Sequence, residues 1–215
     1  MTYDIQIDVD NLAIGYVADV KGTLSFGLSW WEWKELFSNV NHPDRDSIEK
    51  SIPNRLVREA LEQKHCIEKE WYTQEKKVVN WLEELTGWLF PPIPVRICVV
   101  PFQCSQVPFP GLFFIFLGRI RKGWYYPETI AHELAHILFN YYTDFSTGEV
   151  HPLIQLIEEE IAVRLGHRPA YFAYDIPPGA GWVGRAQEMV ETWKYYLSHK
   201  EEYKSIADLM PCMAD

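Results

Sequence analysis

The sequence lacks the features of a secreted, membrane-spanning or nucleic-acid-binding protein. Its N-terminal region has no basic segment followed by an apolar one, so we expect no secretory signal. The longest apolar run, Leu112–Leu117, is far too short to cross a bilayer. Basic residues are scarce: 20 Lys and Arg against 30 Asp and Glu give a net charge of −10, which argues against binding to phosphate backbones.

Cysteine is also scarce, and its spacing excludes the common thiolate metal sites. The four residues Cys66, Cys98, Cys104 and Cys212 contain no Cys-x-x-Cys pair. Without an export signal we expect them to be reduced and structural, in a soluble cytoplasmic protein. Cys98 and Cys104 are alternative soft metal ligands.

What the sequence does have is enough apolar residues for a core, in a chain that fits one domain. Its 215 residues are 47% hydrophobic and 15% aromatic. Alternating apolar residues predict a strand over Tyr3–Val9, and a second strand is expected over Thr23–Leu28. The segment 29–37 is helical in pattern with Ser29 as N-cap, and we expect its tryptophans to fill core rather than to form a ligand platform. Those tryptophans are Trp30, Trp31 and Trp33.

The middle of the chain has the pattern of long helices followed by two strands. Residues 53–88 predict one long helix or two in succession, ended by Gly87 and the "PPIP" segment. Strands are expected over 95–100 and 112–117, and the second should be central in its sheet because both its faces are apolar.

Three further helices complete the expected order. The first carries two histidines, the second starts at Pro152 and ends at Gly166, and the third spans about 182–199. Because strands and helices do not alternate regularly, the predicted class is α+β, with a small mixed sheet. We expect a single domain over 1–215, with an N-terminal extension over about 1–60, a core over 65–166 and C-terminal helices over 181–210.

The most informative stretch is "TIAHELAHILFN", residues 129–140. His132 and His136 project from one face of a helix, with Glu133 on the flank of that face. Apolar residues fill the other positions, so these polar groups would be buried and need partners. One reading pairs the histidines with core carbonyls or carboxylates; the other is the His-Glu-x-x-His zinc site, with Glu133 as general base.

A catalytic zinc site needs a third protein ligand, and the next helix offers candidates. Glu158, Glu159 and Glu160 are flanked by apolar residues, and at about 100° per residue they cannot all face one way. Burial alone favours Glu160 as the inward carboxylate. His151 is an alternative third ligand, and an outer glutamate could instead hold the N–H of a ligand histidine.

His132-Glu133-Leu134-Ala135-His136, followed by Glu159 and Ala162, resembles the gluzincin class of zinc metallopeptidases over about residues 65–166. The resemblance implies a zincin-like fold with a long backing helix, an active-site helix and a glutamate helix, and it implies Glu159 as third ligand. The aspartate that often follows the ligand glutamate by four residues is replaced here by Val163. Candidates for the oxyanion-stabilising residue are Tyr171, Tyr174 and His167.

These observations predict a zinc-dependent metallopeptidase that acts on a peptide or protein and binds neither nucleic acid nor membrane. Zinc, held by His132, His136 and Glu159, would activate a water, and Glu133 would take its proton. One of the two strands before the histidine helix is expected to border the cleft. The alternative function is a non-catalytic zincin-like protein that keeps the metal for structure and binds a partner.

Overall fold

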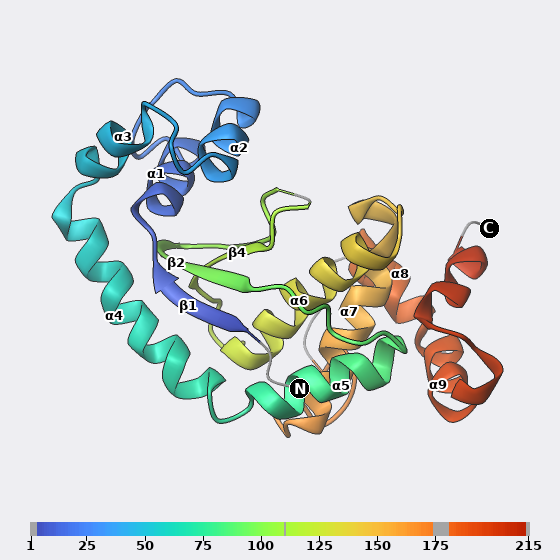
Figure 1. Cartoon of the computed structure of the whole chain (residues 1–215). Coiled ribbons are helices and arrows are strands. Elements are labelled where there is room, and N and C mark those ends of the chain that lie inside the picture. Colours follow the sequence, from blue (N-terminus) through green and yellow to red (C-terminus); the bar gives the residue numbers. More distant parts are fainter. Residues whose placement is uncertain (1–3, 110, 174–180, 214–215) are drawn as a thin grey trace. The chain divides into compact units, whose positions relative to one another are not determined.

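The fold is α+β, as predicted, with a small mixed sheet (Figure 1). A computed structural model describes residues 4–109, 111–173 and 181–213. The chain forms two compact units. Unit 1 comprises Met1–Glu70 and Pro92–Gly123, and unit 2 comprises Trp71–Pro91 and Trp124–Asp215.

Unit 1 contains a four-stranded sheet in the order β1-β2-β4-β3. The strands are β1 (Ile5–Val9), β2 (Val95–Gln103), β3 (Ser105–Gln106) and β4 (Phe114–Arg119). β1 and β4 both pair with β2 in parallel, whereas the short β3 pairs antiparallel with β4. β4 is therefore an inner strand, which confirms the expectation drawn from its two apolar faces.

The helices of unit 1 are α1 (Asn11–Val20), α2 (Trp30–Ser38), α3 (Arg45–Ser51) and α4 (Asn54–Trp71). The predicted Ser29 cap is confirmed, because the Ser29 hydroxyl and the Glu32 carboxylate form a capping box. α1 was not predicted, although Asp10 caps it and it runs through the core beside β2. Trp33 fills core as expected, but Trp31 is 71% exposed.

The predicted strand over Thr23–Leu28 is wrong, because this segment folds back onto the end of α1. The N–H groups of Thr23 and Leu24 donate to the Ala18 carbonyl, and Phe26 N–H donates to the Asp19 carboxylate. Local hydrogen bonds thus replace those of a sheet.

Unit 2 is helical in the part that the structure describes. Its α-helices are α5 (Glu75–Thr86), α6 (Tyr126–Tyr142), α7 (Thr147–Arg164), α8 (Trp182–Glu188) and α9 (Val190–Ser198). Two 3₁₀ segments follow, η1 (Lys200–Glu202) and η2 (Ile206–Met213). α5, α6 and α7 all pack against one another, and α7 also contacts α8 and η2. α7 is therefore the central helix of this unit.

The structure decides one open question about the helices and corrects two predicted helix boundaries. The 53–88 region is two helices, α4 and α5, and Gly87 ends the second in a left-handed conformation, as expected. The final helix is divided into α8 and α9 at Met189. Pro152 lies inside α7 rather than in its first turn.

None of the described helices is long and apolar enough to cross a membrane. Cys66, Cys98 and Cys104 form no disulfide with one another. Burial raises the pKa of the Cys98 thiol, which favours its protonated form.

Candidate metal centre

The histidine pair lies on α6, whose start is fixed by its own residues. Pro127 occupies the first turn, where its missing N–H removes no helical hydrogen bond. Glu128 Oε1 accepts a hydrogen bond from the Tyr125 N–H at 3.2 Å. The helix is then buried on nearly every side, and Glu133 and His136 are only 4% and 6% exposed. Polar side chains in such a place require polar partners or a metal.

The third histidine lies on α7, because that helix begins earlier than predicted. The Ser146 N–H donates to the Glu149 carboxylate at 2.7 Å, which forms a capping box and starts the helix directly after Ser146. Pro152 then falls within the helix and removes one of its hydrogen bonds. His151 is consequently a helical residue rather than a loop residue.

His132, His136 and His151 come together as a group that could hold a metal ion. One ring nitrogen of each lies within 4.8 Å of the corresponding nitrogens of the other two. The ring centroids of His136 and His151 are 4.5 Å apart, and those of His132 and His136 are 5.0 Å apart. Imidazole is a ligand of zinc, copper, iron and nickel, so the donor set fits a transition metal.

Electrostatics keep His136 in its metal-binding form. Burial, reinforced by His132 and His151, lowers the pKa of His136 to about 2, so its ring is neutral. Burial lowers the pKa of His132, but the hydrogen bond to Glu158 and the charges of Glu158 and Glu133 raise it. The net effect is a raised pKa.

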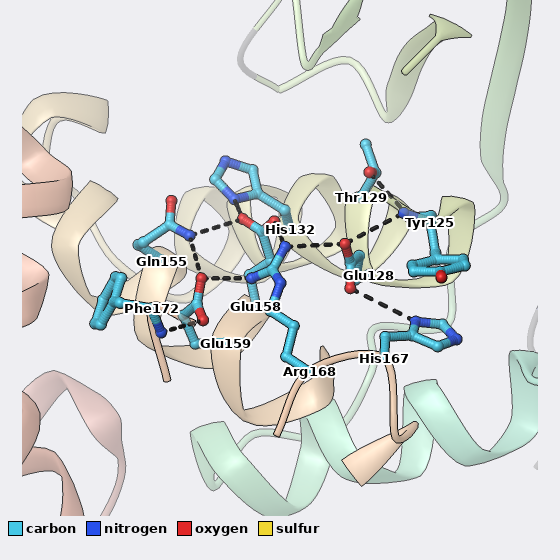
Figure 2. Close-up of polar contacts among 10 residues, drawn as sticks. All are labelled: Tyr125, Glu128, Thr129, His132, Gln155, Glu158, Glu159, His167, Arg168 and Phe172. Carbon is cyan, nitrogen blue, oxygen red and sulfur yellow. Dashed lines mark hydrogen bonds and ion pairs between the residues drawn. The ribbon is translucent and has the colours of Figure 1, made fainter. Parts of the chain in front are cut away.

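A carboxylate orients the first histidine. Oε2 of Glu158 lies 2.8 Å from Nδ1 of His132 (Figure 2). A carboxylate only accepts hydrogen bonds, so the ring donates from Nδ1 and leaves the Nε2 lone pair for a metal. Of the alternatives left open for the triplet, a hydrogen bond from an outer glutamate to a histidine is therefore seen at Glu158.

The predicted third ligand, Glu159, is engaged elsewhere. Its carboxylate accepts hydrogen bonds from Arg168, from Gln155 Nε2 at 3.3 Å and from the Phe172 N–H at 2.8 Å. In the described chain the group with metal-ligand geometry holds His151 in its place. The physical reason is charge: a fully buried carboxylate beside a buried guanidinium pairs with it.

The burial of the three glutamates also differs from the prediction that Glu160 faces inward. Glu158 and Glu159 are 1% and 0% exposed, whereas Glu160 is only partly buried. Glu160 accepts hydrogen bonds from Arg164 Nε at 2.6 Å and from the Tyr171 hydroxyl. Apolar spacing favoured Glu160 as the inward carboxylate, but Glu160 is the least buried of the three and pairs with Arg164 and Tyr171.

Two of the oxyanion candidates make contacts with residues other than the three histidines. Tyr171 bonds to Glu160, and burial raises the pKa of its hydroxyl. His167 stacks on Tyr125 with ring centroids 3.9 Å apart, and its Nδ1 lies 3.5 Å from a Glu128 oxygen. Tyr174 lies outside the described residues.

Arg168, which sequence reasoning did not single out, lies among three buried carboxylates (Figure 2). Its Nη2 is 2.9 Å from Glu128 Oε1 and 3.8 Å from Glu158 Oε1, and its Nη1 bonds to Glu159. Burial raises the pKa of Glu128 to about 7, against the opposing effect of Arg168. The available signal was indirect: buried glutamates require a cation, and Arg168 is a basic residue shortly after their helix.

Two other contributors were also missed. Gln155 Nε2 donates to both Glu158 and Glu159, which joins neighbouring carboxylates. The Trp182 ring lies 4.7 Å from that of His151 and is 50% exposed. Neither residue stands out in sequence, because their roles depend on the contact between α7 and its neighbours.

Comparisons of the chain with protein-family models, with curated proteins and with solved structures give no significant match.

Proposed function

We propose that this protein is a zinc-dependent peptide hydrolase. The observation that carries the proposal is the grouping of His132, His136 and His151. Glu133 directly follows His132 on a buried helix, and a carboxylate at that position supports a role as general base. A purely structural zinc site has no need of such a base.

The ligand set of this proposal differs from the one that the gluzincin resemblance implies. His151 takes the third place, and Glu159 serves as a partner of Arg168. Three imidazole ligands leave one tetrahedral position open, as in catalytic zinc sites with three histidines. The zincin-like fold remains part of the proposal, supported by the packing of α5, α6 and α7.

The roles of the chain's own residues follow from this arrangement. Bound zinc would supply Lewis-acid polarisation of a carbonyl and a lowered pKa for water. Glu133 would accept the proton of the attacking water and pass it to the leaving amine. Glu158 would hold the His132 ring so that its Nε2 faces the ion. The strand expected beside the cleft belongs to unit 1, so its role remains a prediction.

A second candidate function is a zinc-holding protein without catalysis. It is favoured by the engagement of Tyr171 with Glu160 and of His167 with Tyr125, because these are two of the three candidates for stabilising an oxyanion. In this case the metal would tie α6 to α7, and the protein would act through binding. A reduced, cytoplasmic setting fits either function.

The test combines metal analysis with a panel of unstructured peptides. Glu133→Gln should keep about one zinc per chain and lose hydrolysis by about 10²- to 10⁴-fold, because it removes the base and leaves the ligands. Glu84→Gln is the matched control, since Glu84 is a half-exposed carboxylate of unit 2 that pairs with Arg164 and Lys200. A parent protein that holds zinc and cleaves no peptide would support the second candidate instead.

A further inference from the structure

Arg168 lies at the junction of the two helices that carry the histidines. It contacts Glu128 on α6 and both Glu158 and Glu159 on α7. Its side chain is only 7% exposed, and its guanidinium also lies over the Trp124 ring at 5.1 Å. A guanidinium is a planar fork of donors that can serve several carboxylates at once.

A continuous series of contacts leads from this arginine to the metal centre. Glu158 directs one oxygen to His132 Nδ1 at 2.8 Å and the other to Arg168 Nη2 at 3.8 Å. Gln155 Nε2 joins Glu158 to Glu159 with hydrogen bonds of 3.2 and 3.3 Å. The carboxylate that orients the histidine is therefore held from its other side (Figure 2).

The charges explain why this hold is needed. Glu158 and Glu159 are adjacent, both buried, and would repel each other and turn away without a nearby cation. Oε1 of Glu158 has no hydrogen bond in the described chain, so its ionic contact with Arg168 is the interaction that orients that oxygen. Losing the arginine would free Glu158 to rotate away from His132.

The geometry points to Arg168 as a positioning residue of the metal centre, which acts on His132 through Glu158. Arg168 would touch neither metal nor substrate. It would raise the affinity for zinc by keeping the orienting carboxylate in place, since partners of ligand histidines typically change metal affinity by about 10- to 100-fold. Its effect on catalysis rests on the proposed function, whereas its effect on metal binding does not.

The test measures zinc affinity by chelator competition in four variants of the full chain. Arg168→Met should weaken zinc binding about 10-fold or more, and Arg168→Lys should restore part of the loss. Glu158→Gln should weaken binding similarly, and adding Arg168→Met to Glu158→Gln should cost little more, because both act through one carboxylate. The absorption spectrum of bound Co²⁺ should change with Arg168→Met, which a role confined to folding would not produce.

A folded Arg168→Met protein with the parent's zinc affinity and Co²⁺ spectrum would overturn this role. If that variant does not fold, Arg168→Met combined with Glu128→Gln also removes one of the buried carboxyls that Arg168 contacts, and an unchanged zinc affinity there would overturn the role equally. The result is separate from that of the proposed function. A parent that binds zinc and cleaves nothing refutes the hydrolase, while the affinity series still decides on Arg168.

Discussion

Oε2 of Glu158 on α7 lies 2.8 Å from Nδ1 of His132 on α6. This contact gives His132 the tautomer and ring orientation that a metal ligand needs. In the gluzincin pattern an aspartate often stands four residues after the ligand glutamate, a position that Val163 occupies here. Glu158, five residues earlier on the same helix, supplies a carboxylate to His132 instead.

Glu158→Gln should weaken zinc binding by about 10- to 100-fold and leave the helical content unchanged. The amide carries no charge and accepts a hydrogen bond less strongly than a carboxylate does. Chelator competition measures the affinity, with Glu160→Gln as control because that carboxylate pairs with Arg164 and Tyr171. Equal affinities for the two variants would contradict the role of Glu158.

His151→Ala should abolish stoichiometric zinc, because only two ligand histidines would remain. Glu159→Gln should keep the metal and lower the free energy of unfolding by about 3 kcal/mol, because it removes a buried partner of Arg168. Metal analysis and chemical denaturation of both variants check this. The opposite pattern, with zinc lost only in Glu159→Gln, would make Glu159 the third ligand.

Glu128 should make the metal-free protein less stable as pH rises. Burial raises the pKa of Glu128 from about 4.5 to about 7 in the folded state, with the charges of Glu158 and Glu159 adding to burial and Arg168 opposing it. Between these values the folded state binds more protons than the unfolded chain. The contribution of Glu128 to the free energy of unfolding therefore falls by up to about 3 kcal/mol.

Chemical denaturation at about pH 5 and about pH 8 measures this dependence. Glu128→Gln cannot ionise, so its free energy of unfolding should change less between the two conditions than that of the parent. The imidazole of His167 has its Nδ1 3.5 Å from a Glu128 oxygen, and His167→Gln therefore serves as the companion variant. The same pH dependence in parent and Glu128→Gln would refute the shifted carboxyl.

Trp182 should report the arrival of a metal. The centroids of the Trp182 and His151 rings are 4.7 Å apart, so a paramagnetic ion such as Co²⁺ at the histidine group should quench the fluorescence of Trp182. Trp182→Phe should reduce that quenching without abolishing binding. Trp31→Phe is the control, because Trp31 is an exposed tryptophan of unit 1. Equal quenching in both variants would mean that the ion binds away from His151.

Local signals in the sequence predicted local structure well. The Ser29 cap, the helix end at Gly87 and the inner position of β4 each depend on a few neighbouring residues, and each was confirmed. The histidine pair was predictable for the same reason, since a four-residue spacing on a helix sets its own geometry. The Thr23–Leu28 segment was expected to be a strand, but its N–H groups bond back to α1 instead of to a neighbouring strand.

The rest of the centre depends on contacts between helices, which spacing does not encode. His151 was read as a residue before a helix start, because Pro152 suits a first turn, but the capping box at Ser146 and Glu149 sets the start earlier. The choice among Glu158, Glu159 and Glu160 depends on Arg168, which follows α7 in sequence and returns to its buried side. No local pattern determines such a choice.

His151 and Glu158 are both on α7, seven residues apart, which is close to two full helical turns. One stretch of helix therefore sets the register of a candidate ligand and of the carboxylate that orients another. Inserting a single residue between Pro152 and Ile157 would rotate Glu158 by about 100° relative to His151 and separate the two functions. The length of this segment is consequently fixed by the site, even though most of its side chains serve only the core.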